Sequence, residues 1–486
     1  MKEKRFQRLA LGPMRRIWGI KLKKFAWHEL SAADLFLFAL GALFCFLTMY
    51  YWDITVTSRF SLIFIDSLFD GKFLSFYDNA LSSGIVVEGA VYDIGFYIIF
   101  ALWGLPVWIL QKTAGLDPMS VGSLLWFKCL LIVFVAGSLR AFWRILTEAG
   151  YGEKVRDAAC LICLLSPTLL FPVLVSAQYD IIPLYFILEG ISCYLKGQKK
   201  PFLILTAVAM TTKPFAILPA AALILLREKR IRRILPEVLL PLVPMMLLKL
   251  LYSISPGYRE SCGSFLAGML PALLNVSIEM GSVSVSVFML GLFAIYIYAY
   301  GRKETGHREE DNRMALLVTG GIWAVFCLFV NVNMNPYWSV YLAPFLVMVV
   351  FMNGSSLSLS LILELVFHIS LTILFTLKFT WVYGGSNMFE YLLLKPLYQR
   401  LMGDQDGVTV AGILRKLMLE ELRPVLGAAL VASLAGIFFL AARGIRRGAA
   451  EPDGEVEIWH VRARIAFIYV WILLSLAAFV LGTRGY

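Results

Sequence analysis

The chain has 486 residues, of which 59% are hydrophobic and only 16% carry a charge. Soluble proteins usually carry about a quarter charged residues, whereas apolar stretches long enough to cross a bilayer recur here along almost the whole sequence and leave no room for a separate soluble domain. The formal charge of +11 is distributed in short basic runs between apolar segments, which is typical of cytosolic loops in a membrane protein. We therefore expect membrane lipids as partners and no nucleic acid.

The first 33 residues are rich in lysine and arginine and predict a cytoplasmic N-terminus. The first apolar run begins near Asp34, which is too far from Met1 for a cleaved signal peptide, so we interpret it as a retained span. The predicted spans are 34–52, 121–140, 156–175, 180–196, 236–254, 279–300, 313–332, 336–352, 356–378, 423–443 and 463–482. The predicted fold class is all-α, a polytopic transmembrane helical bundle of about 11–13 spans with juxtamembrane amphipathic helices in the first outer loop.

The stretch 201–227 is apolar but is interrupted by Thr211-Thr212-Lys213-Pro214, and cationic loops flank both of its ends. We predict two short helices that meet at Lys213 and form a hairpin starting and ending on the cytosolic side. Broken helices at membrane depth are tolerated only where the free backbone groups face protein or a wet cavity.

The segment 94–112 is ambiguous, because it is apolar enough to span the membrane. If it lies in the interface instead, 30 of the 44 lysines and arginines fall in cytosolic segments. If it spans, every later loop changes side, which places outside the membrane Arg140, Arg144, Arg227, Arg230, Arg232 and Arg233. The bias of positive charge toward the cytosol therefore favours the interfacial position. Trp103, Pro106 and Trp108 also suit the headgroup level.

Two large loops are then expected on the outer face, 53–120 and 379–422. The segment from Arg59 to Tyr77 predicts an interfacial amphipathic helix that ends at Gly71. The second loop contains two amphipathic stretches, Phe389 to Met402 and Val408 to Leu422.

The predicted organisation is a basic N-terminus at 1–33, a main transmembrane module at 34–352 that includes the outer loop 53–120, and C-terminal transmembrane helices at 353–486 with the outer loop 379–422. Inverted repeats, which many transporters contain, are not detectable. A one-sided function is therefore favoured.

Asp53 follows Tyr51 and Trp52 at the outer end of the first span. Placing a polar group near membrane depth costs free energy, so each such residue is a candidate for a functional role. Asp53 is either the first polar loop residue after an aromatic belt, or a carboxylate at the rim of a cavity that takes a proton from an acceptor hydroxyl. Asp66 and Asp70 fall on the polar face of the predicted interfacial helix and are expected to be solvated.

A short outer turn between two spans carries Gln178, Tyr179 and Asp180. Such a turn needs polar residues in any case, but an amide and a carboxylate on the same side as Asp53 are also suited to binding sugar hydroxyls. Lys213 is either a lysine that extends to the nearer interface or a cation placed to bind a phosphate.

Two further polar clusters are Tyr92-Asp93, which opens the 94–112 segment, and the turn Asn335-Pro336-Tyr337-Trp338. The turn by itself is also typical of an aromatic belt.

Motifs of soluble enzymes, including the P-loop, GxSxG and HExxH, do not occur, and the sequence has only four histidines. A histidine-based metal site or triad on the outer face is therefore not expected. The Cys160/Cys163 pair lies in an apolar run without partner ligands, which favours a structural role.

In their order along the chain, these motifs resemble those of the GT-C superfamily of membrane glycosyltransferases, and of its bacterial mannosyltransferase-like members in particular. The family places an acidic residue just after the first span, which Asp53 matches. Three short family motifs are matched by Ala177-Gln178-Tyr179-Asp180, Thr212-Lys213-Pro214 and Asn335-Pro336-Tyr337-Trp338.

The resemblance covers about residues 1–350 and has three departures. Tyr92-Asp93 stands where the family often has Tyr-Pro-Pro, Ala177 replaces a glycine, and Asn335 replaces a frequent histidine.

The resemblance implies an integral plasma (inner) membrane enzyme with an extracytoplasmic active site. It would transfer a sugar from a polyprenyl-phosphate-linked donor to a glycan, lipid or protein acceptor, with inversion of the anomeric centre. Asp53 would deprotonate the acceptor, and Lys213 with Arg259 would bind the phosphate. The other expected substrate-binding residues are Gln178, Tyr179, Asp180, Asn335, Tyr337, Trp338, Tyr92 and Asp93. Some members use a divalent cation such as Mg or Mn; Asp53 with Asp180 could hold one, but nothing in their spacing requires it.

Two alternatives stay open. A lipid-linked oligosaccharide flippase or other secondary transporter would need polar residues lining the middle of several spans, for which Lys128 and Lys249 are the chief candidates. A non-enzymatic membrane scaffold would use its outer loops to bind a partner. Transfer of sugar in detergent separates an enzyme from a transporter, because transport needs two compartments and transfer does not.

Overall fold

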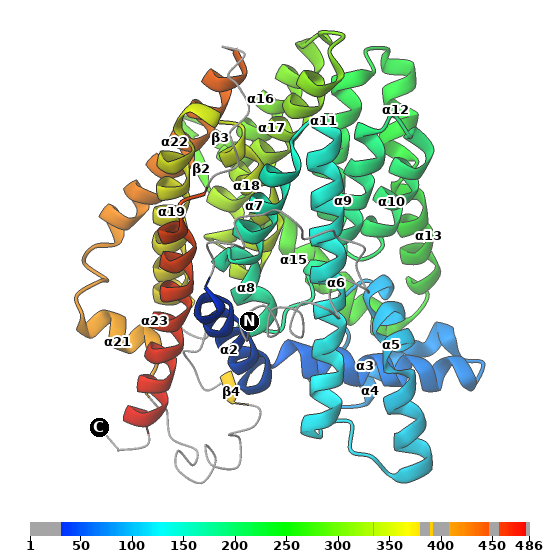
Figure 1. The fold of residues 1–486 in the computed structure, drawn as a ribbon. Coiled ribbons are helices and arrows are strands. Elements are labelled where there is room, and N and C mark those ends of the chain that lie inside the picture. Colours follow the sequence, from blue (N-terminus) through cyan, green and yellow to red (C-terminus); the bar gives the residue numbers. More distant parts are fainter. Residues whose placement is uncertain (1–30, 334, 380–388, 392–407, 447–455, 483–486) are drawn as a thin grey trace.

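The computed structural model describes residues 31–333, 335–379, 389–391, 408–446 and 456–482. Over these residues the chain is an all-α bundle of long helices (Figure 1), which confirms the predicted fold class. Its strands form two short antiparallel pairs. The pairs are β1 (Met49–Tyr51) with β4 (Phe389–Tyr391), and β2 (Ser277–Met280) with β3 (Val283–Ser286).

Six helices among the described residues are long and apolar enough to cross a membrane, and there are eight if each of two bent pairs forms one span. The six are α5 (Ile94–Ala114), α6 (Val121–Glu148), α17 (Arg308–Phe326, continued by the π-turn η6, Cys327–Asn331), α19 (Leu357–Lys378), α22 (Arg423–Arg446) and α23 (Ile458–Gly482). The bent pairs are α7 (Glu153–Leu164) with α8 (Pro167–Leu170) and η3 (Phe171–Val175), bent by 55°, and α12 (Ile231–Leu239) with α13 (Leu242–Tyr252), bent by 44°. The chain is therefore a multi-pass membrane protein.

Several other predicted spans, and the second helix of the predicted hairpin, correspond to shorter apolar helices. These are α2 (Ala32–Thr48), α9 (Ile181–Leu195), α11 (Ile217–Arg227, preceded by the 3-10 turn η4, Pro214–Ala216), α16 (Val287–Gly301) and α18 (Ala343–Phe351, preceded by the 3-10 turn η7, Pro336–Tyr341). The remaining short elements are η2 (Phe73–Ser75), α4 (Phe76–Ser82), α14 (Pro256–Tyr258), η5 (Arg259–Gly263), α15 (Ser264–Leu273), η8 (Gly354–Ser356) and α21 (Val410–Lys416). Helices of this length suit a bundle whose polar turns lie inside the protein rather than in lipid.

The two short helices predicted on either side of Lys213 are present, and the cytosolic location of their outer ends stays a prediction. Helix α10 (Lys199–Met210) ends at Thr211, Lys213 is extended, and Pro214 opens the turn that leads into α11. Proline lacks a backbone N–H and is tolerated in the first turn of a helix but not in its interior, so the break falls where the sequence places it.

The interfacial helix predicted from Arg59 begins earlier. It is α3 (Asp53–Phe69), which lies across the bundle rather than along it (Figure 1). The prediction of its start was wrong because Ile54, Thr55 and Thr57 are poor helix formers in isolation but are buried against the protein here, and tertiary packing overrides such local preferences. Its end is as predicted, because α3 ends at Phe69 and its C-cap Asp70 is followed by Gly71, with φ +70°.

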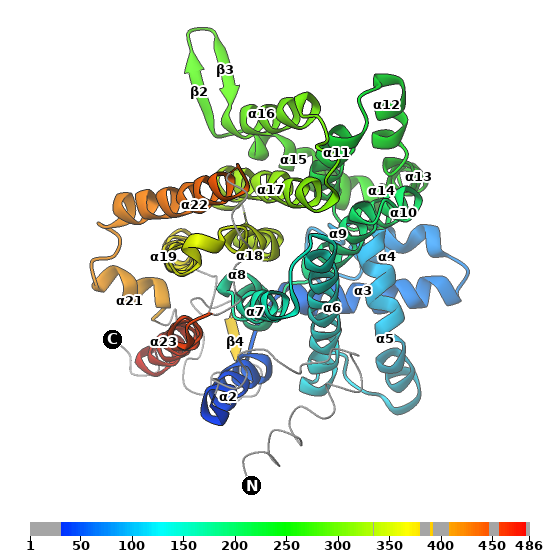
Figure 2. The ribbon, with the colours of Figure 1, turned by 45° about the horizontal axis from the view of Figure 1, so that its top comes forward.

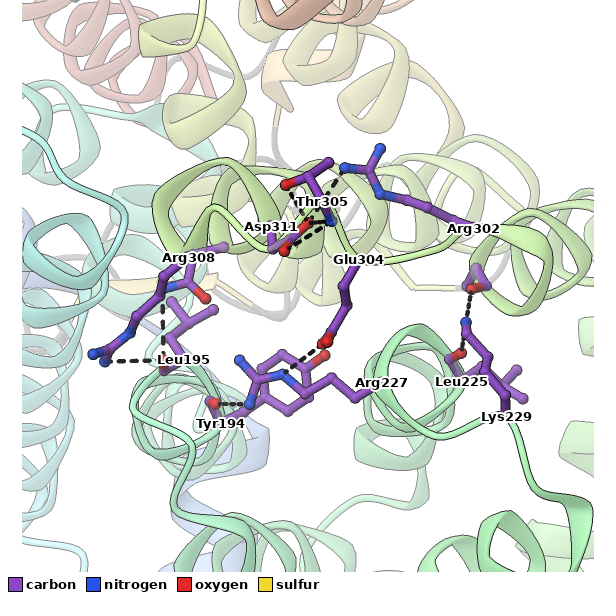
Figure 3. A network of polar contacts seen from close by, with 12 residues as sticks. Tyr194, Leu195, Leu225, Arg227, Lys229, Arg302, Glu304, Thr305, Arg308 and Asp311 are labelled. Carbon is purple, nitrogen blue, oxygen red and sulfur yellow. Dashed lines mark hydrogen bonds and ion pairs between the residues drawn. The ribbon is translucent and has the colours of Figure 1, made fainter.

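Loops that connect the long helices meet at one end of the molecule, which we call the basic end. Arg308 bonds to Glu148 at 2.7 Å and to the Leu195 carbonyl at 3.3 Å, so the ends of α6, α9 and α17 lie together. Lys229 donates to the Ala299 carbonyl at 2.9 Å, which joins the ends of α11 and α16 (Figure 3). These segments are the ones that the charge bias placed together on the cytosolic side.

Helix α5 starts at the opposite end and folds back on α6. A side chain at Gly95 would collide with the Thr211 carbonyl, so the first turn of α5 packs directly on the hairpin break. Further along, the indoles of Trp103 and Trp126 stack with centroids 4.8 Å apart, and each donates a hydrogen bond to the other's backbone carbonyl. Only the far end of α6 reaches the basic end. The chain thus passes from one end of the bundle to the other once between residues 93 and 148, as the interfacial interpretation requires. Helix α5 is nevertheless long enough to span a membrane, so the membrane position of α5 stays a prediction.

The C-terminal helices pack on the N-terminal ones. Helix α23 lies beside α2 (Figure 2), and Arg462 pairs with Asp34 at 3.0 Å. Of the two amphipathic stretches predicted in the loop 379–422, the first extends beyond the described residues after Tyr391. The second contains α21.

Candidate functional site

Asp53 is held at the start of α3. The chain leaves α2 at Thr48, passes through the short strand β1, and Asp53 becomes the first residue of the new helix. The Gln178 side-chain nitrogen donates to Asp53 Oδ2 at 3.0 Å. Two residues that are 125 positions apart are therefore in direct contact, and the sequence analysis had placed both at the outer surface.

Gln178 is presented by a tight turn that follows η3. The backbone N–H of Gln178 donates to the Pro172 carbonyl at 2.8 Å, and the backbone N–H of Tyr51 donates to the Ser176 carbonyl at 3.1 Å. The second bond ties this turn to the strand that leads into Asp53. Between them, Ala177 is fully buried and has φ +52°, in the left-handed region that favours glycine.

The backbone at Ala177 gives a stability prediction. Glycine at this position should leave the free energy of unfolding within about 1 kcal/mol of wild type, because relief of the left-handed strain offsets the greater freedom of the unfolded chain. Valine should lower it by at least about 2 kcal/mol, because a β-branched side chain is strained at positive φ and overpacks a buried turn. Thermal unfolding of the purified variants in detergent measures the difference. Equal stability of the glycine and valine variants would contradict the strained turn.

Lys213 and Asp180 form a buried ion pair on the other side of the same turn. The distance from Lys213 Nζ to Asp180 Oδ1 is 3.5 Å, and the side chains are 9% and 3% exposed. The Tyr341 hydroxyl donates to the same carboxylate oxygen at 3.0 Å. Asp180 therefore forms an ion pair with a lysine of the hairpin break and accepts a hydrogen bond from a tyrosine of η7.

Aromatic rings enclose the Lys213 ammonium. It lies 4.9 Å from the ring centroid of Tyr92, 5.5 Å from that of Trp338 and 5.8 Å from that of Phe96. Cation–π attraction is strongest where water is excluded, as it is here. Lys213 is therefore held by the protein and does not extend to the bilayer surface as the alternative interpretation required.

Tyr179 and Tyr92 pack against each other in the same site. Their rings pack edge to face at 5.3 Å, and the Tyr179 hydroxyl accepts a hydrogen bond from Thr57 at 2.9 Å. Because Thr57 lies one turn after Asp53 in α3, this bond fixes α3 against the polar turn. We call Asp53, Tyr92, Gln178, Asp180 and Lys213 the polar cluster.

The environment of Asp53 shifts its acidity. Asp53 begins α3, outside the candidate spans, and removal from bulk water raises the pKa of its carboxyl group to about 6. Hydrogen bonds from Gln178 and Tyr92 and the charge of Lys213 oppose this shift, whereas the charge of Asp180 adds to it. At neutral pH Asp53 is a carboxylate whose pKa is closer to 7 than that of an ordinary aspartate, which suits a general base.

A second carboxylate–lysine pair adjoins the polar cluster. Lys249 of α13 lies 2.7 Å from Asp93, which directly follows Tyr92. Tyr77, Tyr252 and Tyr258 pack around this pair, and together they line a cavity of about 10 Å³, close to the space for one water molecule. Lys249 was considered only as a transporter residue from the sequence, although an ionisable residue inside an apolar run is itself a signal of function.

The other predicted site residues are not members of the polar cluster. The Asn335 side chain accepts from the Tyr337 amide at 2.9 Å and so shapes the start of η7. The Tyr337 ring packs 5.7 Å from that of Tyr51. Arg259 is exposed at the start of η5 and makes no ion pair with the cluster carboxylates among the residues that the structure describes.

Sequence reasoning missed Tyr341 as a partner in the site. Tyr341 bonds to Asp180 across 161 positions. It lies in an apolar run, where an aromatic residue by itself gives no signal of a polar partner.

The suggested divalent-cation site does not fit the geometry. Asp180 is already neutralised by Lys213, and Asp53 accepts from Gln178. Among the described residues, no three or more histidine, cysteine, aspartate or glutamate side chains are grouped so that they could hold a metal ion.

Comparison with known proteins gives no relative: no protein-family model, no curated protein and no solved structure matches this chain. The resemblance to the GT-C superfamily therefore rests on the short motifs and on their order along the chain.

Proposed function

We propose that this protein is an integral membrane glycosyltransferase that moves a sugar from a polyprenyl-phosphate-linked donor to an acceptor hydroxyl. The observation that carries the proposal is the polar cluster itself, in which a carboxylate of raised pKa contacts Gln178 and a shielded ammonium contacts Asp180 of the same buried turn. A base for the acceptor and a cation for the leaving phosphate are the two groups that such a transfer needs.

The transfer runs as a single displacement. Asp53 takes the proton of the acceptor hydroxyl as the hydroxyl oxygen attacks the anomeric carbon, and the bond from that carbon to the phosphate oxygen breaks. The polyprenyl phosphate leaves with the bonding electron pair, and Lys213 balances its charge. The products are the glycosylated acceptor, the lipid phosphate and a protonated Asp53, which then loses its proton to water.

The location of the cluster supports an extracytoplasmic site. Lys213 lies at the ends of α10 and α11 that are opposite the basic end, and basic loops are retained in the cytosol. A lipid-linked donor has its phosphate at the headgroup level, where the break at Lys213 and the transverse helix α3 would meet it.

The contacts of two lysines weaken the transporter alternative. Lys249 pairs with Asp93 beside the polar cluster, and Lys128 donates to backbone carbonyls at the end of α2. Neither lysine is placed to line a path through the middle of the bundle, which was the reason to consider transport.

The direct test is transfer in detergent. The purified protein is incubated with radiolabelled polyprenyl-phosphate sugars and a mixture of membrane glycan, lipid and protein acceptors, and labelled product is separated from donor. Product formation without sealed vesicles supports a transferase. If label only moves across the membrane of sealed vesicles while the donor stays intact, the protein is a transporter and the proposed transferase function is wrong.

The pH dependence of transfer is a separate prediction. The rate should fall to half on the acid side near pH 6, because Asp53 must be ionised to accept a proton. The pKa of Asp53 is higher in the folded than in the unfolded chain, so protonation of this group stabilises the fold as the pH falls through about 6 and below. The acid loss of activity should therefore occur without a loss of stability caused by Asp53. An activity profile that is flat from pH 7 to 4.5 would argue against this base.

A further inference from the structure

Lys128 of α6 is a buried lysine with an unusual set of partners. Lys128 is only 1% exposed. Its ammonium donates to the backbone carbonyls of Cys45 at 3.2 Å, Phe46 at 2.5 Å, Met49 at 2.5 Å and Leu174 at 3.4 Å. Within the described part of the chain it forms no ion pair with a carboxylate. A buried charge is costly unless it is compensated, so this position asks for a reason.

The four carbonyls explain how the charge is compensated. Cys45, Phe46 and Met49 are at the end of α2, and Leu174 is in the last turn of η3. The last carbonyls of a helix have no partner within it, and the helix dipole makes this end negative. Lys128 therefore binds two helix ends at once, and their carbonyls take the place of a carboxylate counter-ion for its ammonium.

Both of these ends lead directly to the polar cluster. Asp53 follows Met49 by four residues, and Gln178 follows Leu174 by four residues. The two connecting segments are also joined by the bond from the Tyr51 amide to the Ser176 carbonyl. Lys128 thus fixes the starting points of the two segments whose side chains meet in the Asp53–Gln178 hydrogen bond.

We propose that Lys128 is a positioning residue that sets the alignment of Asp53 with Gln178 by holding the ends of α2 and η3 together. Its consequence for catalysis rests on the proposed transferase function, but the alignment itself does not. Lys128 contacts no member of the polar cluster, so its loss should act through geometry and leave the binding contacts of Lys213 in place.

Substitution of Lys128 by methionine tests this inference in full-length protein. Methionine retains the apolar length of the side chain but removes the donor, so the four carbonyls lose their shared partner. Hydrogen–deuterium exchange should be faster in peptides covering 49–55 and 174–180. In a transfer assay kcat should fall by on the order of 10²-fold, because small misplacements of a reacting group are costly. The donor KM should change by less than about 2-fold, because binding contacts that are unaltered keep their affinity.

Arginine at position 128 and asparagine at position 34 are the matched variants. Lys128→Arg retains donors for the carbonyls and should recover part of both the protection and the rate. Asp34→Asn removes the ion pair with Arg462 at the other end of α2 and should lower stability without exposing either peptide. If Lys128→Met does not accumulate, the arginine variant carries the comparison with Asp34→Asn.

The outcomes separate this inference from the proposed function. Faster exchange in both peptides with Lys128→Met, but not with Asp34→Asn, supports the alignment role even if the wild type transfers no sugar. An active wild type with an unchanged kcat in Lys128→Met overturns it and leaves the transferase intact. Equal exchange in wild type and Lys128→Met also overturns it.

Discussion

Asparagine at position 53 is expected to reduce sugar transfer by about 10²- to 10⁴-fold, the usual contribution of a general base. The amide has nearly the shape of the carboxylate and can still bond to Gln178, so expression, folding and donor binding should be retained. The variant removes the ability to accept the acceptor's proton and little else. The measurement is the initial rate of transfer at saturating donor, alongside the affinity for the polyprenyl phosphate product.

Asp66 provides the matched control for this substitution. It lies on the same helix α3, but its side chain is 41% exposed and pairs with Lys112 at 2.8 Å, away from the polar cluster. Asp66→Asn should transfer sugar at nearly the wild-type rate. The residual activity of Asp53→Asn should also lose the acid limb near pH 6. Near-full activity of Asp53→Asn would remove Asp53 from the mechanism.

Loss of the Lys213 ammonium is expected to weaken donor binding more than turnover. Hydrogen bonds to charged groups contribute about 1.5–3 kcal/mol, so Lys213→Met should lower donor affinity by at least about 10-fold. The same substitution leaves Asp180 buried with Tyr341 as its remaining described partner, which should lower the free energy of unfolding by about 3 kcal/mol. A binding defect and a folding defect must therefore be separated.

The double substitution Lys213→Met with Asp180→Asn separates them. It removes both charges of the buried pair, so stability should return close to that of wild type, because a pair removed as a whole leaves no uncompensated charge. Donor affinity should stay low, since the cation is still absent. Titration with polyprenyl phosphate and thermal unfolding measure the two effects on the same samples. Wild-type affinity in the stable double variant would show that Lys213 has only a structural role.

The sequence by itself determined the membrane class, the broken hairpin and most members of the candidate site. Hydropathy and the distribution of lysine and arginine are properties of local segments, and a bilayer selects on them directly. The break at Lys213 followed from one proline in an apolar run. Asp53, Gln178 and Asp180 were identifiable because a polar residue beside an apolar span is costly and therefore noticeable.

Only the tertiary structure decided which of these residues touch. The Asp53–Gln178 bond, the Asp180–Tyr341 bond and the carbonyl partners of Lys128 connect positions that are 46 to 161 residues apart. The start of α3 was likewise set by packing, since Ile54, Thr55 and Thr57 are helical because they are buried. A local pattern shows that a group needs a partner, but the choice of partner depends on how distant helices pack, and that packing depends on the whole chain.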